Sequence, residues 1–200
     1  MDMSNFSTTG RLPSGITVLA ATAVQPPLTN WNLSHNNLVS FPLVILDVST
    51  LLHLDLSWNM LSSMPSGIIK LAHLQVLNIS HNQFTYFPSS ILKLKESLLE
   101  LYLQDNKLEE IRNDFLKLSY LEVLDVSNNR LKTLPSGLNS HMKLKFFRFS
   151  GNPVFDGFPF QSKTKNGPTP GVLKFSSTGN IHTTRRARRR LQQQKKKPNR

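Results

Sequence analysis

The 200-residue chain contains no cysteine, which excludes a disulfide framework, a thiolate zinc site and a cysteine nucleophile. No apolar run approaches the roughly 18 residues that a membrane-spanning helix needs. Acidic residues are missing from the last forty positions, which hold twelve of the twenty-four Lys and Arg residues. The first 160 residues carry twelve basic and twelve acidic side chains, so the net charge of +12 comes from the C-terminal segment. A domain that binds polyanions along its folded face has a different charge pattern.

Common catalytic motifs are missing as well. The sequence contains no GxGxxG, no phosphate-binding loop ending in Lys and Ser or Thr, and no HExxH. Spacing alone does not place Asp47, Asp55 or Asp125 beside both a serine and a histidine. We therefore expect no enzymatic activity, no metal and no other cofactor.

The chain does contain a repeat with a spacing of 23 or 24 residues. Each copy follows the pattern LxxLxLxxNxL, as in Leu51, Leu54, Leu56, Asn59 and Leu61. Six copies are in phase, and their asparagines are Asn36, Asn59, Asn82, Asn106, Asn129 and Asn152. In four copies a proline follows, and an Ile or Leu stands three residues after it; the prolines are Pro42, Pro65, Pro88 and Pro135.

The pattern predicts the structure of one unit. Alternating leucines indicate a short strand with one face turned inward. The proline-marked half returns on the outer side, and its apolar spacing of three suits a helical or 3₁₀ turn. One unit cannot bury enough apolar surface to offset the entropy cost of ordering it, so the units must stack. We expect the six asparagines to form a structural ladder that satisfies backbone groups where each strand ends.

This pattern resembles the leucine-rich repeat family over about residues 28 to 154. It looks closest to the 23-residue intracellular subclass, LxxLxLxxNxLxxLPxxIxxLxx, of Ras-suppressor and Scribble-like proteins. The resemblance implies an α/β fold, a right-handed leucine-rich-repeat solenoid. Its short parallel strands would line the concave face, and short helical, 3₁₀ or irregular segments the convex face. It also implies a non-enzymatic protein–protein adaptor or scaffold in intracellular signalling, although one architecture serves many partners.

Three segments are predicted. Residues 1–27 form an N-terminal segment with a degenerate half-repeat cap at Leu12 to Ile16, residues 28–160 hold six repeats and an aromatic-rich C-terminal cap, and residues 161–200 form a disordered basic tail. The fourth repeat has Arg112 in place of proline and an extra residue near Lys95, and both changes should fall on the outer side. Residues 16–24 imitate a signal peptide, but the half-repeat and the lack of cysteine caps favour an intracellular chain.

The outward-pointing strand positions are the candidate partner-binding surface. We predict that it includes His35, Asp55, Trp58, His81, Tyr102, Asp105, Asp125 and Arg148. Trp58, flanked by His35 and His81 with Tyr102 nearby, would form an exposed aromatic cluster of the kind that anchors protein interfaces. Alternatively, Trp58 folds over a neighbouring serine. His35 and His81 lie two strand spacings apart, nearly 10 Å, which is too far to share one metal ion.

The tail carries RRARRRLQQQKKK between Arg185 and Lys197. Its two basic clusters resemble a bipartite nuclear-import signal and consist of Arg185, Arg186, Arg188, Arg189, Arg190, Lys195, Lys196 and Lys197. Import, binding to RNA or DNA, and attachment to an acidic membrane surface remain open. We expect a monomer of the nucleus or cytoplasm that binds another protein. The alternatives are a nucleic-acid-associated nuclear protein, or a regulatory subunit of a phosphatase or ubiquitin ligase.

Overall fold

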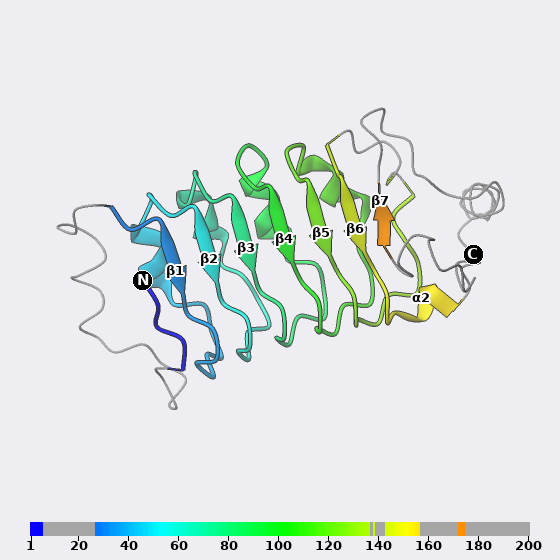
Figure 1. Ribbon diagram of the computed structural model, residues 1–200, viewed down its shortest axis with the longest axis horizontal. Helices are drawn as coiled ribbons and strands as arrows, with labels where there is room; N and C mark the ends of the chain where they lie inside the picture. Colours follow the sequence, from blue (N-terminus) through cyan, green and yellow to red (C-terminus); the bar gives the residue numbers. More distant parts are fainter. Residues whose placement is uncertain (6–26, 137, 139–142, 157–171, 175–200) are drawn as a thin grey trace.

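The computed structural model describes residues 1–5, 27–136, 138, 143–156 and 172–174. Its strands form one sheet in chain order, with the 3₁₀ segments behind it (Figure 1). The strands are β1 (Asn30–Asn32), β2 (His53–Asp55), β3 (Val76–Asn78), β4 (Glu100–Tyr102), β5 (Val123–Asp125), β6 (Phe146–Arg148) and β7 (Val172–Lys174). β1 to β6 are parallel neighbours, and β7 pairs antiparallel with β6. The predicted solenoid is confirmed.

The leucines of the repeat set the strand register. Leu54 pairs with Leu77, which pairs with Leu101 on the next strand. Each of these side chains is almost completely buried in one continuous core, while the residues on either side of it in the strand are more exposed. This alternation leaves one sheet face toward solvent, which we call the strand face.

The return half of each of the first four repeats contains a 3₁₀ segment. These segments are η1 (Leu43–Asp47), η2 (Ser66–Lys70), η3 (Ser89–Leu94) and η4 (Asn113–Lys117). η1 to η3 each follow a proline, whose ring fixes φ near the value that the entry to the segment needs. The extra residue of the fourth repeat is absorbed where η3, one residue longer than the others, turns toward β4. The strand register is unchanged there, as predicted.

The six repeated asparagines connect neighbouring repeats. Asn82 shows the common pattern: its Nδ2 donates to the carbonyl oxygens of Ile79 and Ser80 in its own turn and of Leu56 in the preceding repeat. Its Oδ1 accepts from the Leu61 amide at 2.8 Å. The other five side chains also donate to several carbonyl oxygens at the ends of their strands. All six are buried.

The first five residues extend the sheet beside β1, which the sequence did not predict. The Met3 amide donates to the Asn32 carbonyl, and Asn36 Nδ2 donates to the Met3 carbonyl, both at 2.8 Å. The Met3 carbonyl therefore accepts from Asn36 in the same way as the Leu33 carbonyl accepts from Asn59 one repeat later. Residues 1–5 act as the strand of an additional partial repeat. The half-repeat cap expected at Leu12 to Ile16 lies outside the described residues.

The C-terminal end also differs from expectation. A short helix, α2 (Pro153–Asp156), follows the last asparagine, within the predicted aromatic-rich cap. The three residues of β7 lie inside the segment predicted to be disordered, and they cover the outer edge of β6. The remainder of that segment lies outside the described residues. Within the described part of the chain, no helix has the length and apolar character needed to cross a membrane.

Candidate functional site

A column of residues at the C-terminal ends of the strands has left-handed backbone. These residues precede the ladder asparagines and have φ between 50° and 67°: His35, Trp58, His81, Asp105, Asn128 and Gly151. Glycine, asparagine and aspartate adopt this conformation readily, whereas it is uncommon for a bulky side chain such as tryptophan. The repeated turn projects the column along one rim of the sheet, which we call the rim column.

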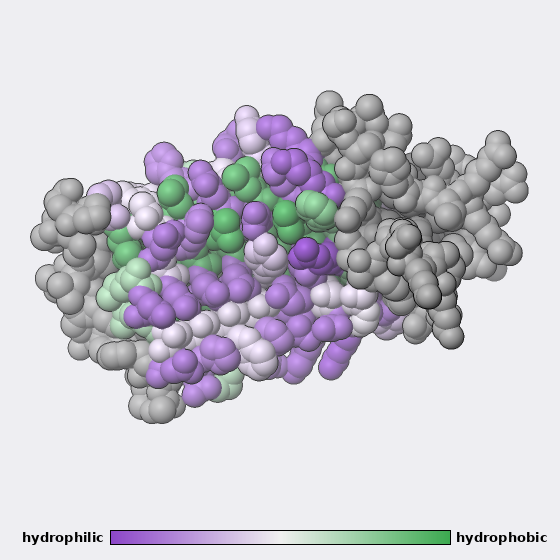
Figure 2. Space-filling model, in the orientation of Figure 1, coloured by the Kyte–Doolittle hydropathy of each residue, from purple (hydrophilic) through white to green (hydrophobic). Residues whose placement is uncertain are grey.

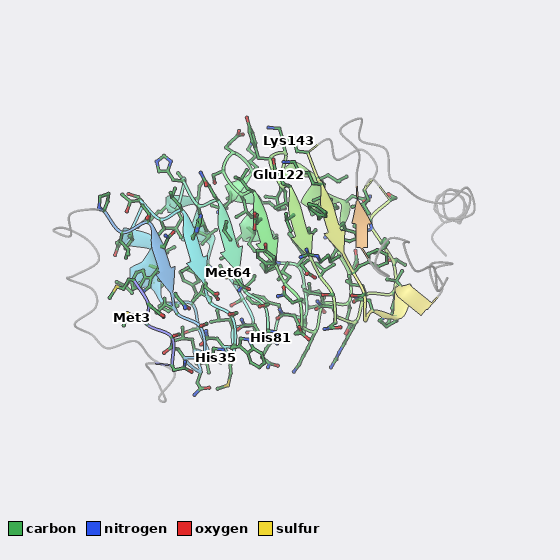
Figure 3. The ribbon with its side chains drawn as sticks, in the orientation of Figure 1. Met3, His35, Met64, His81, Glu122 and Lys143 are labelled. Carbon is green, nitrogen blue, oxygen red and sulfur yellow. The ribbon has the colours of Figure 1, made fainter. Side chains whose placement is uncertain are left out.

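Three aromatic rings stack in the first half of the rim column. The ring centroids of His35 and Trp58 are 5.0 Å apart, and those of Trp58 and His81 are 3.8 Å apart, with interplanar angles of 12° and 13°. Trp58 nevertheless remains 51% exposed, and neighbouring Met60 is 45% exposed. Figure 3 places His35 and His81 at the lower edge, below the strand ends. The alternative in which Trp58 folds over a serine is not the arrangement observed.

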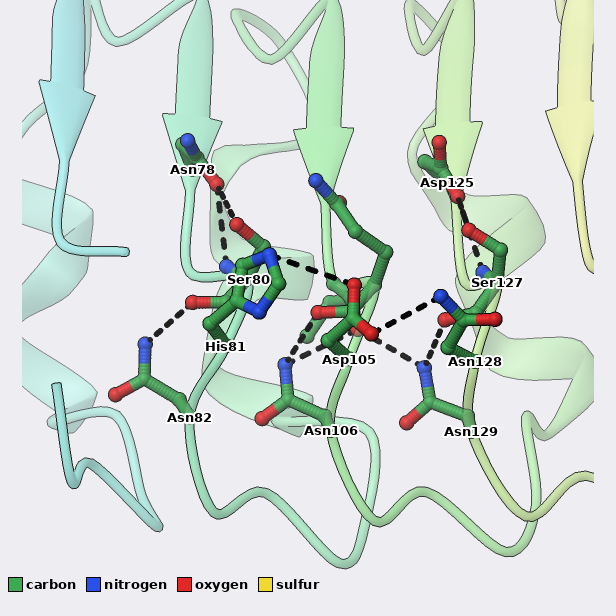
Figure 4. Close-up of polar contacts among 12 residues, drawn as sticks. Asn78, Ser80, His81, Asn82, Asp105, Asn106, Asp125, Ser127, Asn128 and Asn129 are labelled. Atoms are coloured by element: carbon green, nitrogen blue, oxygen red, sulfur yellow. Dashed lines mark hydrogen bonds and ion pairs between the residues drawn. The ribbon is translucent and has the colours of Figure 1, made fainter. Parts of the chain in front are cut away.

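The rim column continues as a polar network. His81 Nε2 lies 3.4 Å from Asp105 Oδ2, and Asn128 Nδ2 donates to Asp105 Oδ1 at 3.0 Å (Figure 4). Residues from three consecutive repeats are thereby joined through one carboxylate. His81 is thus held on one side by Trp58 and on the other by Asp105, which fixes the orientation of the stacked rings.

A hollow of about 440 Å³ lies on the strand face between residues 1–5 and β4. Its lining includes Asp2, His53, Asp55, Asn78 and Tyr102. Asp55 Oδ1 accepts from the Ser57 amide at 2.8 Å, and its Oδ2 accepts from Asn78 Nδ2 at 3.1 Å. The Asp55 carboxylate is therefore held in place by two neutral donors in the lining of the hollow.

Tyr102 lies in the hollow rather than in the aromatic stack. Among the described residues, Trp58 makes ring contacts with His35 and His81, and Tyr102 is not part of that group. The Tyr102 hydroxyl donates to Glu100 Oε2 at 2.6 Å. Burial, followed by this hydrogen bond and the negative charge of Glu100, raises the pKa of Tyr102 to about 12. The phenol is thus a fixed neutral donor at neutral pH.

The C-terminal half of the strand face is internally paired. Asp125 accepts from the Ser127 amide and hydroxyl, and its Oδ2 lies 3.5 Å from Arg148 Nη1. Asp125 is also buried, so its carboxylate is much less available to a partner than the sequence suggested. Lys145 Nζ lies 2.5 Å from Glu122 Oε2. The predicted site therefore divides into an open half over β1 to β4 and a neutralised half over β5 and β6.

Two features of this surface escaped the sequence analysis. Met1 and Asp2 line the hollow. They were not predicted, because nothing in the sequence indicated a partial repeat at residues 1–5. Glu100 was missed because the outward-pointing positions were read from the residue between the two leucines of LxL onward, whereas Glu100 precedes the first of these leucines. In Figure 2 the strand face carries a hydrophobic area toward the N-terminal ends of the strands and is mostly hydrophilic toward their C-terminal ends. Leu52, Val76, Leu99 and Val123 are partly exposed at those N-terminal ends.

The described residues contain no candidate metal site, and the basic segment of the tail lies outside them. In residues 1–5, 27–136, 138, 143–156 and 172–174, no group of three His, Cys, Asp or Glu side chains could hold a metal ion. The predicted basic positions from Arg185 to Lys197 lie outside these residues. The structure thus brings together His35, Trp58, His81 and Asp105 on the rim, and Asp55 and Tyr102 in the hollow.

Comparison with known proteins finds the same repeats. Two family models, both described as leucine rich repeat, match residues 73–94 and 96–154. A leucine-rich repeat protein of Leptospira interrogans is 32% identical over 72% of this chain and 35% of its own length, with a TM-score of 0.62. TLR13, in a structure of its complex with ssRNA13, is 30% identical over 64% of this chain and 18% of its own, with a TM-score of 0.59.

An internalin of Listeria monocytogenes shares the fold alone, at 21% identity over 68% of this chain and 37% of its own, with a TM-score of 0.56. This chain thus spans between 18% and 37% of the length of these three structures. The curated proteins give no match.

Proposed function

Because the chain is a leucine-rich repeat protein, we propose that it is a non-enzymatic adaptor that binds a partner protein through its strand face. The open half of that face supplies the binding surface: the hollow with Asp55 and Tyr102, and the rim with Trp58. We place the chain with the 23-residue intracellular repeats of Ras-suppressor and Scribble-like proteins, acting as a monomeric signalling scaffold in the cytoplasm or nucleus.

The stacked Trp58 is the observation that carries this proposal. A tryptophan that only filled space would be buried, yet this one is half-exposed on a turn whose backbone conformation disfavours it. Its ring is fixed between two histidine rings, so little side-chain entropy is lost when a partner packs against it. Preorganised aromatic side chains of this kind are common binding hot spots.

Substitution of Trp58 by asparagine tests the proposal without strain on the turn. Asn128 occupies the same repeat position with φ 52°, against 55° for Trp58, so the variant keeps a favourable backbone. We expect Trp58→Asn to weaken partner capture by at least about tenfold, as loss of a hot-spot residue does. The measurement is quantitative affinity purification of the full chain from cell extract, followed by binding titration with the purified partner.

Tyr120→Asn is the matched control, since it removes an exposed aromatic residue that precedes β5 and lies outside the rim column. A partner retained by Tyr120→Asn and lost by Trp58→Asn supports the assignment. If every partner binds both variants equally, the rim is not the binding surface.

A second candidate function rests on the basic segment. We propose as the alternative a nucleic-acid-associated nuclear protein in which the solenoid carries the tail, since eight of thirteen residues from Arg185 to Lys197 are basic. Retention of the full chain on RNA or DNA should then fall steeply with salt, and neutralisation of the five arginines should abolish it. Retention that Trp58→Asn abolishes and arginine neutralisation spares would reject this candidate.

A further inference from the structure

The carboxylates of the open half of the strand face have no Lys or Arg partner among the described residues. Asp55 is held by a backbone amide and an amide side chain, and Glu100 accepts from the Tyr102 hydroxyl. Asp105 contacts His81 and Asn128. These three side chains come from adjacent or nearly adjacent strands and all remain partly accessible. Their negative charges are stabilised by dipoles and are not cancelled by a neighbouring lysine or arginine.

Five carboxylates elsewhere in the described residues are paired with cations: Asp47, Glu96, Asp114, Glu122 and Asp125. On the strand face, Asp125 pairs with Arg148 and Glu122 with Lys145. On the return segments, Asp47 pairs with Lys70 and Asp114 with Lys117, at 3.7 and 3.5 Å. The strand face is therefore electrically uneven: its carboxylates over β5 and β6 are paired with cations, whereas Asp55, Glu100 and Asp105 on the open half and the adjoining rim have no Lys or Arg partner among the described residues.

The chain carries the complementary charge in its own C-terminal segment. Eight basic residues stand between Arg185 and Lys197, with no acidic residue among them. Lys174, the last residue of β7, pairs with Phe146 at the edge of the same sheet. Five strand spacings of about 4.8 Å separate β7 from β2, roughly 24 Å. The eleven residues from Lys174 to Arg185 can span about 36 Å when extended, which is enough to cross the face.

We propose that the basic segment Arg185–Lys197 docks on the open half of the strand face, across the hollow and the adjoining rim. Guanidinium and ammonium groups would contact Asp55, Glu100 and Asp105, and the arginine stems would pack beside the stacked rings. Tethering raises the effective concentration of the segment to the millimolar range. A segment that binds in trans with a dissociation constant of about 1 mM is then docked roughly half of the time.

The docked segment would compete with the partner protein for the strand face, and only this consequence rests on the proposed adaptor role. A docked segment covers the surface that would receive the partner. The partner must therefore displace it, and conditions that weaken ionic contacts open the face. Docking itself is testable without any partner, so its failure is distinguishable from failure of the proposed function.

Limited trypsin cleavage of the full chain tests the docking. Cleavage between Arg185 and Lys197 is timed in the natural sequence and in the triple variant Asp55→Asn, Glu100→Gln and Asp105→Asn. Asparagine is suited to two of these positions, because Asn78 and Asn128 occupy them in other repeats. We expect the triple variant to be cleaved on the order of threefold faster at low salt, and the difference to vanish near 0.5 M salt, where charges are screened.

A matched control carries the same three changes of residue type on the return side: Asp47→Asn, Glu96→Gln and Asp114→Asn. It should be cleaved at the rate of the natural sequence. Its net charge changes by the same amount as that of the strand-face variant, but its strand face is unchanged. Carbodiimide treatment of the natural chain should also join Lys195, Lys196 or Lys197 to Asp55 or Glu100. Circular dichroism melting checks that all three proteins are equally folded.

Two results would overturn the proposal. Equal cleavage of the natural chain and both triple variants at low salt means that the segment does not dock on this face. Protection that disappears on dilution means that the segment docks on a second copy. In either case, an added Arg185–Lys197 peptide that binds the natural chain but not the strand-face variant would assign the face to a cationic segment from another molecule.

Discussion

At the residue scale, the buried side chain of Asn82 connects two repeats through four hydrogen bonds. Asn82→Ala leaves the Leu61 amide and several carbonyl oxygens without this partner in the interior. Each buried group that loses its partner costs about 1–3 kcal/mol, and some relaxation is expected, so we predict a loss of about 2–4 kcal/mol in the free energy of unfolding. Urea denaturation monitored by circular dichroism measures it.

Asn113→Ala is the control for that measurement. The Asn113 side chain is exposed and donates to the Ser136 hydroxyl, so its loss should change the free energy of unfolding by no more than about 0.5 kcal/mol. Equal losses in the two variants would show that the ladder asparagines are not structurally special.

Tyr102 gives a prediction about pH. A spectrophotometric titration should show one phenol that ionises near pH 12, since burial and the Glu100 hydrogen bond raise its pKa. The unfolded chain ionises the same phenol near the ordinary tyrosine pKa of 10.0, so the native state holds this proton to a higher pH. The associated stability is present below pH 10 and is lost as pH rises from 10 to 12.

Glu100→Gln should lower this pKa, because it removes the negative charge and keeps a hydrogen-bond acceptor beside the phenol. A titration curve that is identical in Glu100→Gln would contradict the role assigned to Glu100. Tyr102→Phe identifies the signal, which should be missing from its titration.

The rim column illustrates what the sequence can and cannot predict about a site. Repeat spacing alone placed His35, Trp58 and His81 on neighbouring units, and the structure brings their rings together. Their stacking depends on a left-handed turn and on side-chain rotamers, neither of which the spacing encodes. Tyr102 was expected nearby, but its position in the strand directs it into the hollow. The sequence thus locates a column, while the backbone turn decides which side chains meet.

At the element scale, the entry to η4 shows why a proline can be absent. Arg112 precedes η4 with φ −74° and ψ 155°, close to the −70° and 150° of Pro65 before η2. Among the backbone hydrogen bonds of the described residues, none has the Arg112 amide as donor. Arg112→Pro therefore fits the native backbone and restricts the unfolded chain. We predict a gain of about 0.4–1 kcal/mol, seen as a higher urea midpoint with an unchanged slope.

Arg112→Ala separates the two effects of that substitution, because it removes the same side chain without adding the ring. It should leave the urea midpoint nearly unchanged. A destabilised Arg112→Pro protein would mean that the Arg112 amide or the residue before it has a requirement that proline does not meet.

The sequence predicted the elements that recur from repeat to repeat and missed those that occur only at the ends of the solenoid. The proline and the apolar spacing of three predicted the 3₁₀ segments, since both features recur in register. The strand at residues 1–5 was missed because Met1 and Met3 replace the usual leucines and only half a unit is present. β7 was missed because three residues in a polar segment carry no periodic signal; the edge of β6, not the local sequence, provides the reason for the strand.

At the scale of the whole molecule, the solenoid is a one-dimensional stack in which each repeat contacts only its neighbours. β3 and β4 have complete repeats on both sides, whereas β1 depends on residues 1–5 and β6 on β7. Amide hydrogen exchange should therefore be slowest in β3 and β4 and faster toward both ends. Uniform protection across all strands would contradict this picture.

Met3→Asp tests how far disorder at one end spreads. Met3 is buried against the first repeat, and an aspartate there would carry a desolvated charge, so residues 1–5 should detach from β1. We expect exchange of the β1 amides to accelerate by about tenfold or more, while β4 and β5 keep their rates because several repeats separate them from the change. Asn5→Asp adds the same charge at an exposed position and should alter neither end. If Met3→Asp accelerates β5 as much as β1, the repeats unfold as one cooperative unit, and the partial repeat at residues 1–5 stabilises the entire solenoid.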